Sequence, residues 1–291
     1  MKFFLFKSIL TITAILPLKF VHHLGDLIGK LTWITNSRIR RIAEKNIKHC
    51  FPELTSQQQT ELVQKILNET GKVILEAGKM WKQNPEQTLA LVKECENERL
   101  IKQAQQQGRG VILAAPHFGS WELVGLYCAR HYAMTSMYAP QADPKADSLI
   151  RQARQRTGAK LVPTDINGIR AMSKALKNTE LVAILPDQSP NENGLFVPFF
   201  KHPCYTMTLL PKLAKKNNAV VLYTYAQRLE KGNGFKMIFR EASVNLATLD
   251  IEQATKQMNL DVEKLIRENP HQYQWTYKRF KKQPEGCGSI Y

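Results

Sequence analysis

The chain has 291 residues, enough for one large α/β domain or two small ones with a sizeable core. Its 41 Lys and Arg residues outnumber 25 Asp and Glu residues, which gives a formal net charge of +16. A hydrophobic content of 43% excludes both a disordered basic tail and a protein with many membrane spans. The positive charge favours anionic partners: nucleic acid, an anionic membrane face, phosphorylated substrates or an acidic carrier protein.

The N-terminal stretch, residues 3–21, is apolar apart from Lys7, Lys19 and small hydroxyl side chains. Its length matches the ~20 residues that cross a bilayer, although Lys7 and Pro17 weaken that interpretation. A helix lying in the membrane interface and a cleaved signal peptide are the alternatives, but no small-x-small cleavage site follows. We therefore expect residues 1–35 to form a membrane anchor, spanning or interfacial.

Charge counting predicts the orientation of this anchor. Only Lys2 and the terminal amine precede the apolar stretch, whereas a series of basic residues follows it: Lys19, Lys30, Arg38, Arg40, Arg41, Lys45 and Lys48. The positive-inside rule places the main domain, residues 36–291, on the cytoplasmic face of the membrane. Five scattered cysteines without a C-x-x-C pair agree with a reducing compartment and argue against a disulfide framework or a zinc knuckle.

Farther along the chain, a basic amphipathic helix is expected over 38–50, and Thr55 or Ser56 caps a long helix with a buried apolar stripe. Beyond residue 110, short apolar runs typical of strands covered on both faces alternate with helical segments. The runs lie at 111–116 and around Met137, Leu161, Ala183 and Leu222; the helices are expected over 121–131, 145–157, 168–177 and 206–216. A late antiparallel strand over 234–241 and a helix over 250–268 complete the pattern. This order predicts a mixed, largely parallel α/β sheet flanked by helices.

The sharpest local feature is A-A-P-H-F-G-S-W-E over residues 114–122. His117 directly follows a buried strand, at the sheet edge where α/β active sites lie. Glu122 stands five residues on and meets His117 if the chain turns at Phe118 and Gly119 before a helix begins. A carboxylate bonded to Nδ1–H then leaves Nε2 as a general base.

Other interpretations of this segment are simpler. A histidine satisfied at a strand end is as good an explanation of the H-x4-E spacing taken alone. Zinc is disfavoured because no third ligand is evident, so no metal is expected. Ser120 and Cys128 are conceivable nucleophiles, but neither sits in a G-x-S-x-G elbow, and Cys128 suits a small core residue.

Residues 36–286 resemble the bacterial lipid A biosynthesis acyltransferase family, the membrane-anchored branch of the H-x4-D/E acyltransferases. The resemblance runs through eight blocks in order: CFPEL (50–54), GRGVILAAPHFGSWE (108–122), RQRTGAKLV (154–162), NGIRA (167–171), AILPDQ (183–188), GLFVPFF (194–200), TMTLLPKLA (206–214) and NPHQYQWTYKRFKKQPEG (269–286). It implies a glycerol-phosphate-acyltransferase-like fold and transfer of a fatty acyl chain from a thioester to a hydroxyl of a lipid A precursor. The donor is expected to be acyl carrier protein or acyl-CoA, with no further cofactor, at the anionic bacterial inner membrane.

Carried over from the family, His117 is the general base and Glu122 orients and charges it. Arg154 and Arg170 fall on basic family positions and are interpreted as phosphate or carrier contacts, or as solvated helix-face arginines. Asp187 either shapes the site or caps the next segment, and Thr206 either contacts substrate or is a helix N-cap.

The chain departs from the family pattern at three places. Ala139 stands where the family usually has Arg, which removes a candidate phosphate clamp. Tyr277 replaces a frequent histidine, and His202-Pro203 replaces a glycine-containing turn. These differences leave open another acceptor, such as a phosphatidylinositol mannoside, an amino-acid lipid or another glycolipid. A nucleic-acid-binding module is disfavoured because no recognition motif is present, and a membrane scaffold with a decayed site is a third possibility.

Overall fold

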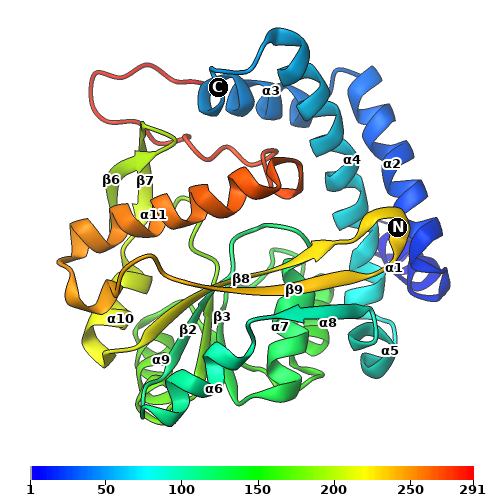
Figure 1. The fold of residues 1–291 in the computed structure, drawn as a ribbon. Helices are drawn as coiled ribbons and strands as arrows, with labels where there is room; N and C mark the ends of the chain where they lie inside the picture. Colours follow the sequence, from blue (N-terminus) through cyan, green and yellow to red (C-terminus); the bar gives the residue numbers. More distant parts are fainter. Residues whose placement is uncertain (1) are drawn as a thin grey trace.

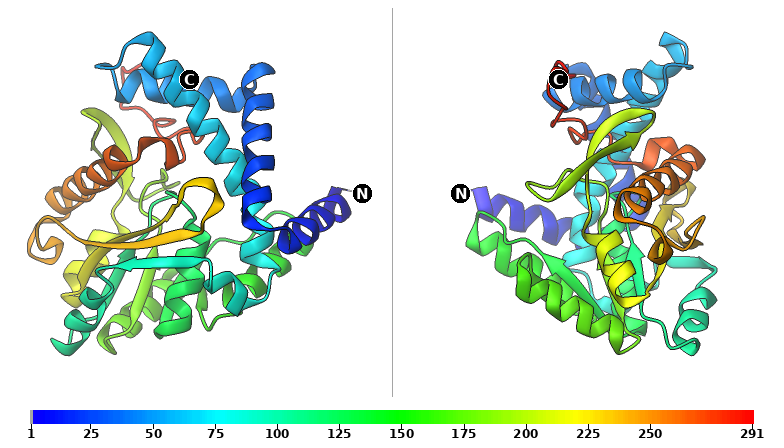
Figure 2. Two further views of the ribbon diagram at one scale, coloured as in Figure 1. Left: turned by 45° about the vertical axis from the view of Figure 1, so that its right-hand side comes forward. Right: turned by 90° about the vertical axis from the view of Figure 1, so that its left-hand side faces the viewer.

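The computed structural model describes residues 2–291, and its first two helices pack against the body of the fold. A single helix over 3–21 is wrong: the chain forms α1 (Lys2–Ile15) and α2 (Leu18–Ile34), separated at Pro17. Proline lacks the N–H that would continue the first helix and clashes with the turn before it. Figure 2 shows α1 projecting from the body at a steep angle to α2. Within residues 2–291 no helix combines the length and apolar character needed to cross a bilayer, so the expected spanning helix is not supported.

A seam of glycines joins α2 to the long helix α4 (Ser56–Trp81), which follows α3 (Arg38–Cys50). A Cβ atom at Gly25 would lie 2.6 Å from the Lys72 backbone nitrogen, and one at Gly71 would lie 2.1 Å from the Gly25 carbonyl oxygen. Only glycine permits this approach of the two backbones. Thr55 begins α4 with a reciprocal capping box to Gln58, as the sequence predicted.

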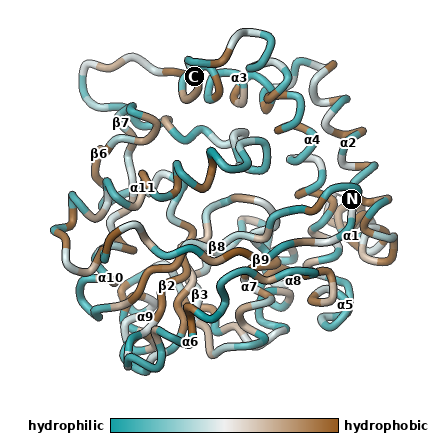
Figure 3. The backbone as a smooth tube through the Cα atoms, viewed as in Figure 1, coloured by the Kyte–Doolittle hydropathy of each residue, from teal (hydrophilic) through white to brown (hydrophobic). Residues whose placement is uncertain are grey.

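The outer face of α1 and α2 is apolar and uncovered within residues 2–291. Its exposed side chains recur at helical spacing: Phe4, Leu5, Ile9, Ile12 and Ile15 on α1, and Phe20, Leu24, Leu27, Leu31 and Ile34 on α2. Figure 3 shows α1 as a largely hydrophobic segment at the edge of the molecule. We call these ten residues the apolar helix face.

A seven-stranded sheet forms the centre of the fold, in the order β1-β9-β8-β2-β5-β3-β4. Figure 1 labels β2, β3, β8 and β9 of this sheet. The strands from β8 to β4 are parallel to one another, whereas β9 runs antiparallel to β8, as predicted for residues 234–241. The bounds are β1 (Val92–Glu96), β2 (Val111–Ala114), β3 (Met134–Tyr138), β4 (Lys160–Pro163), β5 (Leu181–Ile184), β8 (Val220–Arg228) and β9 (Phe235–Glu241). The prediction of a mixed, largely parallel sheet is confirmed.

Helices cover both faces of this sheet, and the apolar runs of the sequence reflect that burial. In β2, Ile112 and Ala114 belong to the hydrophobic cluster on one face, and Val111 and Leu113 belong to the cluster on the other. Residues of α9, α10 and α11 join the first cluster, and residues of α6 and α7 join the second. The helix bounds are α5 (Pro85–Leu89), α6 (Arg99–Gln106), α7 (Trp121–His131), α8 (Pro144–Gln155), α9 (Ile166–Lys177), α10 (Leu209–Asn217) and α11 (Ile251–Glu268).

A separate antiparallel hairpin, β6 (Gly194–Phe199) and β7 (His202–Met207), stands outside the main sheet. It corrects the expected helix start at Thr206, because Thr206 lies in β7 and α10 begins only at Leu209. The buried Thr206 hydroxyl oxygen accepts hydrogen bonds from Asn259 and Arg279. Thr206 therefore neither caps a helix nor is available to substrate in this structure.

Candidate active site

His117 and Asp187 meet because their strands are adjacent and in register. Strands β2 and β5 are parallel neighbours, with Ala114 opposite Ile184. Each strand continues for three residues, through Ala-Pro to His117 and through Leu-Pro to Asp187. Both side chains therefore leave the carboxyl edge of the sheet at equivalent positions, where α/β active sites lie.

Two hydrogen bonds join the pair. The His117 backbone N–H donates to Asp187 Oδ2, and His117 Nδ1 lies 2.9 Å from Oδ1. Burial alone would raise the pKa of Asp187, but His117, with its two hydrogen bonds, and Arg279 outweigh burial and lower it. Because Asp187 is a carboxylate that only accepts, the Nδ1 atom carries the imidazole proton and Nε2 is left with a lone pair.

Glu122 has a different partner, so its expected contact with Nδ1 is wrong. Gly119, at φ +58°, lets the chain turn alongside β8, and a Cβ there would lie 2.1 Å from the Ala226 carbonyl oxygen. Helix α7 then begins at Trp121, and the carboxylate of Glu122 accepts two hydrogen bonds from Arg154 and one from Trp81 Nε1. The H-x4-E spacing thus places Glu122 in an ion pair beside the site and leaves Asp187 to hold the imidazole.

The two predicted arginines lie in different settings. Arg154 is partly buried, and its Glu122 partner raises its pKa although burial opposes this. Arg170 is exposed on α9, where its side chain makes no hydrogen bond or ion pair with any other residue between 2 and 291. The structure therefore brings Arg154, but not Arg170, into contact with a predicted site residue.

Two buried groups near Asp187, Arg279 and Tyr273, were not identified from the sequence. Arg279 is almost fully buried and donates to the Tyr205 carbonyl oxygen and the Thr206 hydroxyl. Burial and the charge of Asp187 raise the pKa of Tyr273 well above its usual range. Both belong to the quoted C-terminal block, but nothing local in that block indicates contact with a residue about 90 positions earlier.

The alternative nucleophiles do not fit the geometry. Cys128 is fully buried on α7, and burial raises the pKa of its thiol far above the physiological range. Ser120 is also buried, with its backbone N–H donating to the Ala226 carbonyl oxygen. Within residues 2–291 neither side chain forms a hydrogen bond with His117, so neither has the adjacent base that would activate a nucleophile.

Three cavities share Trp121 in their lining, and the Trp121 ring centroid lies 5.1 Å from that of His117. The first, of about 90 Å³, is apolar and extends under α7 among Leu126, Met134, Met137 and Leu161. The other two, of about 220 and 240 Å³, share Val73 and Ile74 of α4 with Trp121. We call these the inner cavity and the two α4 cavities.

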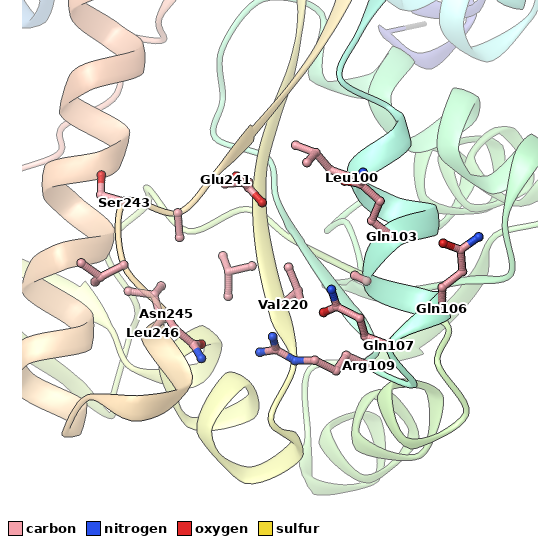
Figure 4. A pocket seen from close by; sticks show the side chains of 14 residues that line it. Leu100, Gln103, Gln106, Gln107, Arg109, Val220, Glu241, Ser243, Asn245 and Leu246 are labelled. Carbon is pink, nitrogen blue, oxygen red and sulfur yellow. The ribbon is translucent and has the colours of Figure 1, made fainter.

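A cavity of about 700 Å³, larger than these three, lies elsewhere (Figure 4). Its walls include Arg109 and Val220, which stand at the starts of β2 and β8, and the amide side chains of Gln103, Gln107 and Asn245. This is the amino edge of the parallel strands, opposite to the edge that carries His117. It contains none of the predicted site residues.

Comparison with known proteins identifies the family of the chain. The family model described as bacterial lipid A biosynthesis acyltransferase matches residues 1–282. The chain is 30% identical over 286 residues, 98% of its length and 92% of the relative's, to "Lipid A biosynthesis lauroyltransferase" of Escherichia coli (strain K12). It is also similar to the "Lipid A biosynthesis palmitoleoyltransferase" of the same strain, at 28% identity over 95% of this chain and 90% of the relative. The "Lipid A biosynthesis myristoyltransferase" of that strain is 23% identical, over 94% and 84% respectively. The chain is therefore an acyltransferase that belongs to the bacterial lipid A biosynthesis acyltransferase family.

Proposed function

We propose that this enzyme transfers a fatty acyl chain from an acyl thioester to a hydroxyl of a lipid A precursor, with His117 Nε2 as the general base. The observation that carries the proposal is the His117–Asp187 pair, which fixes the imidazole proton on Nδ1. Its neighbour Trp121 lines three largely apolar cavities. The acceptor hydroxyl gives its proton to Nε2 while its oxygen attacks the thioester carbonyl carbon. The carbon–sulfur bond then breaks, and the departing sulfur takes the proton.

The charge of the chain supports an acidic donor. A net charge of +16 attracts an acidic acyl carrier protein over a long range, and the same field attracts anionic lipid. Acyl carrier protein is thus the proposed donor, with acyl-CoA as the alternative. Arg154 is proposed to contribute at the mouth of the inner cavity rather than as a free phosphate ligand, because Glu122 already holds it.

The test is an assay with the purified enzyme. A lipid A precursor is offered with acyl carrier protein thioesters or with acyl-CoA, and product mass is measured. One added acyl group in an ester that alkali removes is expected. Absence of transfer from both donors to the lipid A precursor would overturn the proposal.

A second acceptor class is favoured by one departure from the family. Ala139 follows β3 where family members usually carry an arginine, so a phosphate clamp is missing there. Phosphatidylinositol mannoside, amino-acid lipids and other glycolipids therefore belong in the same assay. Transfer to one of these and not to the lipid A precursor would assign the enzyme to that acceptor.

The apolar helix face supports attachment to the anionic bacterial inner membrane in an interfacial geometry, with the catalytic domain on the cytoplasmic side. The glycine-lined face of α2 packs against α4, and the side chains of the apolar helix face, which point away from α4, stay exposed within residues 2–291. Exposed Lys7, Lys19 and Lys30 stand on the same two helices and suit anionic headgroups. The α4 cavities share the half-exposed Ile74, and one of them is lined by Phe6 of α1. We propose that a membrane lipid reaches His117 along them, past Trp121, which lines both.

Charges placed on this face are expected to release the enzyme from lipid. The double variant Leu24→Glu, Leu31→Glu is expected to bind anionic vesicles at least about ten-fold more weakly, because burying one leucine contributes roughly 1.5–3 kcal/mol. Vesicle flotation measures the bound fraction. Val244→Glu, Leu260→Glu is the matched control, since both residues are exposed apolar side chains outside the helix face. Equal binding by the two double variants would contradict the interfacial geometry.

The inner cavity is proposed to receive the acyl tail. Its present volume of about 90 Å³ equals that of only about three water molecules, so the flexible side chains of Met134 and Met137 must move to admit a chain. Gly125 of α7 lines this cavity, and a Cβ there would meet nothing within 4 Å. The absence of a side chain at position 125 thus leaves room for the tail.

Filling that space is expected to shorten the preferred chain. In Gly125→Leu, kcat/KM for long acyl donors is expected to fall about four-fold for each methylene excluded, while short donors are used as before, since each buried CH₂ contributes roughly 0.8 kcal/mol. A series of acyl donors of increasing length measures the profile. Gly288→Leu is the control, because a Cβ there also meets nothing within 4 Å but lies outside the cavity. An unchanged profile in Gly125→Leu would show that the tail binds elsewhere.

A further inference from the structure

The lone pair of His117 Nε2 already has a partner in this structure. Gln188 Nε2 lies 3.2 Å from His117 Nε2 and 3.1 Å from Gln274 Oε1. Since Nδ1 carries the imidazole proton, the Gln188 amide donates one hydrogen to His117 and the other to Gln274. The amide therefore stands where an acceptor hydroxyl must bind to lose its proton.

The residues on both sides of Gln188 are held by hydrogen bonds, whereas the Gln188 side chain is only half-buried. The Asp187 carboxylate accepts from the His117 backbone N–H, and the Ser189 backbone N–H donates to the Tyr277 hydroxyl. Gln274 is held as well, because its backbone N–H donates to the His117 carbonyl oxygen. Rotation about side-chain bonds is thus sufficient to move the amide away from Nε2 while the surrounding backbone stays in place.

We propose that Gln188 is a catalytic residue: its amide caps Nε2 in the substrate-free enzyme, yields that position to the acceptor hydroxyl, and then donates a hydrogen bond to the thioester carbonyl oxygen. This inference rests on the proposed acyl transfer. When the hydroxyl oxygen bonds to the carbonyl carbon, the C=O electron pair moves to oxygen, and the proton moves to Nε2. The negative oxygen then accepts the N–H of Gln188, while Gln274 keeps the amide oriented through its other hydrogen. Collapse restores C=O, breaks the carbon–sulfur bond and returns the proton from Nε2 to the sulfur.

The chemistry fits an amide at this place. An amide N–H stabilises an oxyanion without supplying a proton of its own, so it does not compete with His117 as acid or base. The same N–H, resting on Nε2, keeps the base hydrogen-bonded when no substrate is present. Tyr277, a departure from the family pattern, supports the segment that carries Gln188 by holding Ser189.

Steady-state kinetics of Gln188 variants test the proposal. Gln188→Met keeps the size and removes both hydrogens; kcat is expected to fall about 10²–10³-fold with KM changed much less, the usual effect of removing one oxyanion donor. Gln188→Glu places a carboxylate beside Nε2 and favours the protonated imidazole, so the acid limb of its pH–rate profile is expected to move to higher pH. Gln106→Met, an exposed glutamine on α6, is the control and is expected to behave as wild type.

The outcomes separate this inference from the proposed function. An inactive wild-type enzyme would refute the acyl transfer itself, whereas an active wild type with unaltered Gln188→Met kinetics would refute only the role of Gln188. A raised KM with unchanged kcat, or a higher kcat, in Gln188→Met would likewise overturn the oxyanion role. Gln188 would then only cap His117 Nε2 until the acceptor displaces it. Thermal unfolding of each variant identifies a folding defect, and Gln188→Glu, which keeps a polar side chain, then provides the decisive pH profile.

Discussion

Asp187→Asn is expected to lower kcat by about 10²–10⁴-fold, the range that general-base catalysis contributes. Asparagine keeps the shape of the side chain but no longer requires a proton on His117 Nδ1. The amide nitrogen can donate to Nδ1, which moves the imidazole proton to Nε2 and blocks the base. Single-turnover kinetics with saturating donor and acceptor measure this loss directly.

Glu122→Gln is the matched comparison for that experiment. Glu122 contacts Arg154 and Trp81, so its loss is expected to loosen the mouth of the inner cavity and to raise KM for the acyl donor. The role of Glu122 in the reaction is thus proposed to be positioning. If Asp187→Asn kept kcat within about ten-fold of wild type, the assignment of Asp187 as the imidazole partner would be wrong.

Glu76→Gln is expected to lower the free energy of unfolding by about 3–5 kcal/mol, the usual cost of removing one partner from a buried ion pair. Arg228 donates from Nε and Nη2 to the two oxygens of Glu76, at 2.7 and 2.8 Å, and His22 of α2 lies 2.7 Å from the same carboxylate. All three side chains are buried. Glutamine would leave the Arg228 charge with one carboxylate partner, Glu69 at 3.3 Å, in place of two, and urea-induced unfolding measures the loss.

The pH dependence of the same carboxylate has a definite sign. Burial would raise the pKa of Glu76, but Arg228 and the His22 hydrogen bond lower it from 4.5 to about 2. Because the folded pKa lies below the unfolded value, this stabilisation is complete above about pH 4.5 and is lost as the pH falls toward 2. The loss over that window is on the order of 3 kcal/mol, and Glu76→Gln is expected to lack this component. Identical acid sensitivity of variant and wild type would contradict the argument.

The sequence predicted the central sheet well because burial on both faces leaves short apolar runs such as 111–116 and 181–184. Strand β1 was missed because its residues, Val-Lys-Glu-Cys-Glu, are polar and lie at the sheet edge. The hairpin β6–β7 was missed because it lies outside the sheet whose alternation guided the prediction. At the N-terminus, the length and apolar content of residues 3–21 favour one helix, whereas Pro17 is the local signal for the break between α1 and α2.

The site was predicted in part for a related reason. His117 was identified from its place after a buried strand, but its partner was sought nearby in sequence, whereas Asp187 is 70 residues away. The matching endings Ala-Pro-His and Leu-Pro-Asp indicate that His117 and Asp187 occupy equivalent positions. This can be recognised only once β2 and β5 are known to be neighbouring strands. The pairing of Glu122 with Arg154 likewise depends on the packing of α7 against α8, which no local pattern reveals. The boundary proposed at residues 35 and 36 stays a prediction.

The packing of the first two helices has a practical consequence for dissecting the enzyme. Phe6 of α1 lines one α4 cavity, the Lys79 ammonium donates to the Ala14 carbonyl oxygen, and His22 contributes to the charge cluster around Glu76. Deleting residues 1–35 would remove Phe6 from the lining of that α4 cavity and expose the buried charges of Lys79 and Glu76 to solvent. A generic hydrophobic tag could return such a fragment to a lipid surface, but it would restore none of these contacts. The first two helices are therefore part of the folded enzyme and cannot be replaced by another membrane-binding segment.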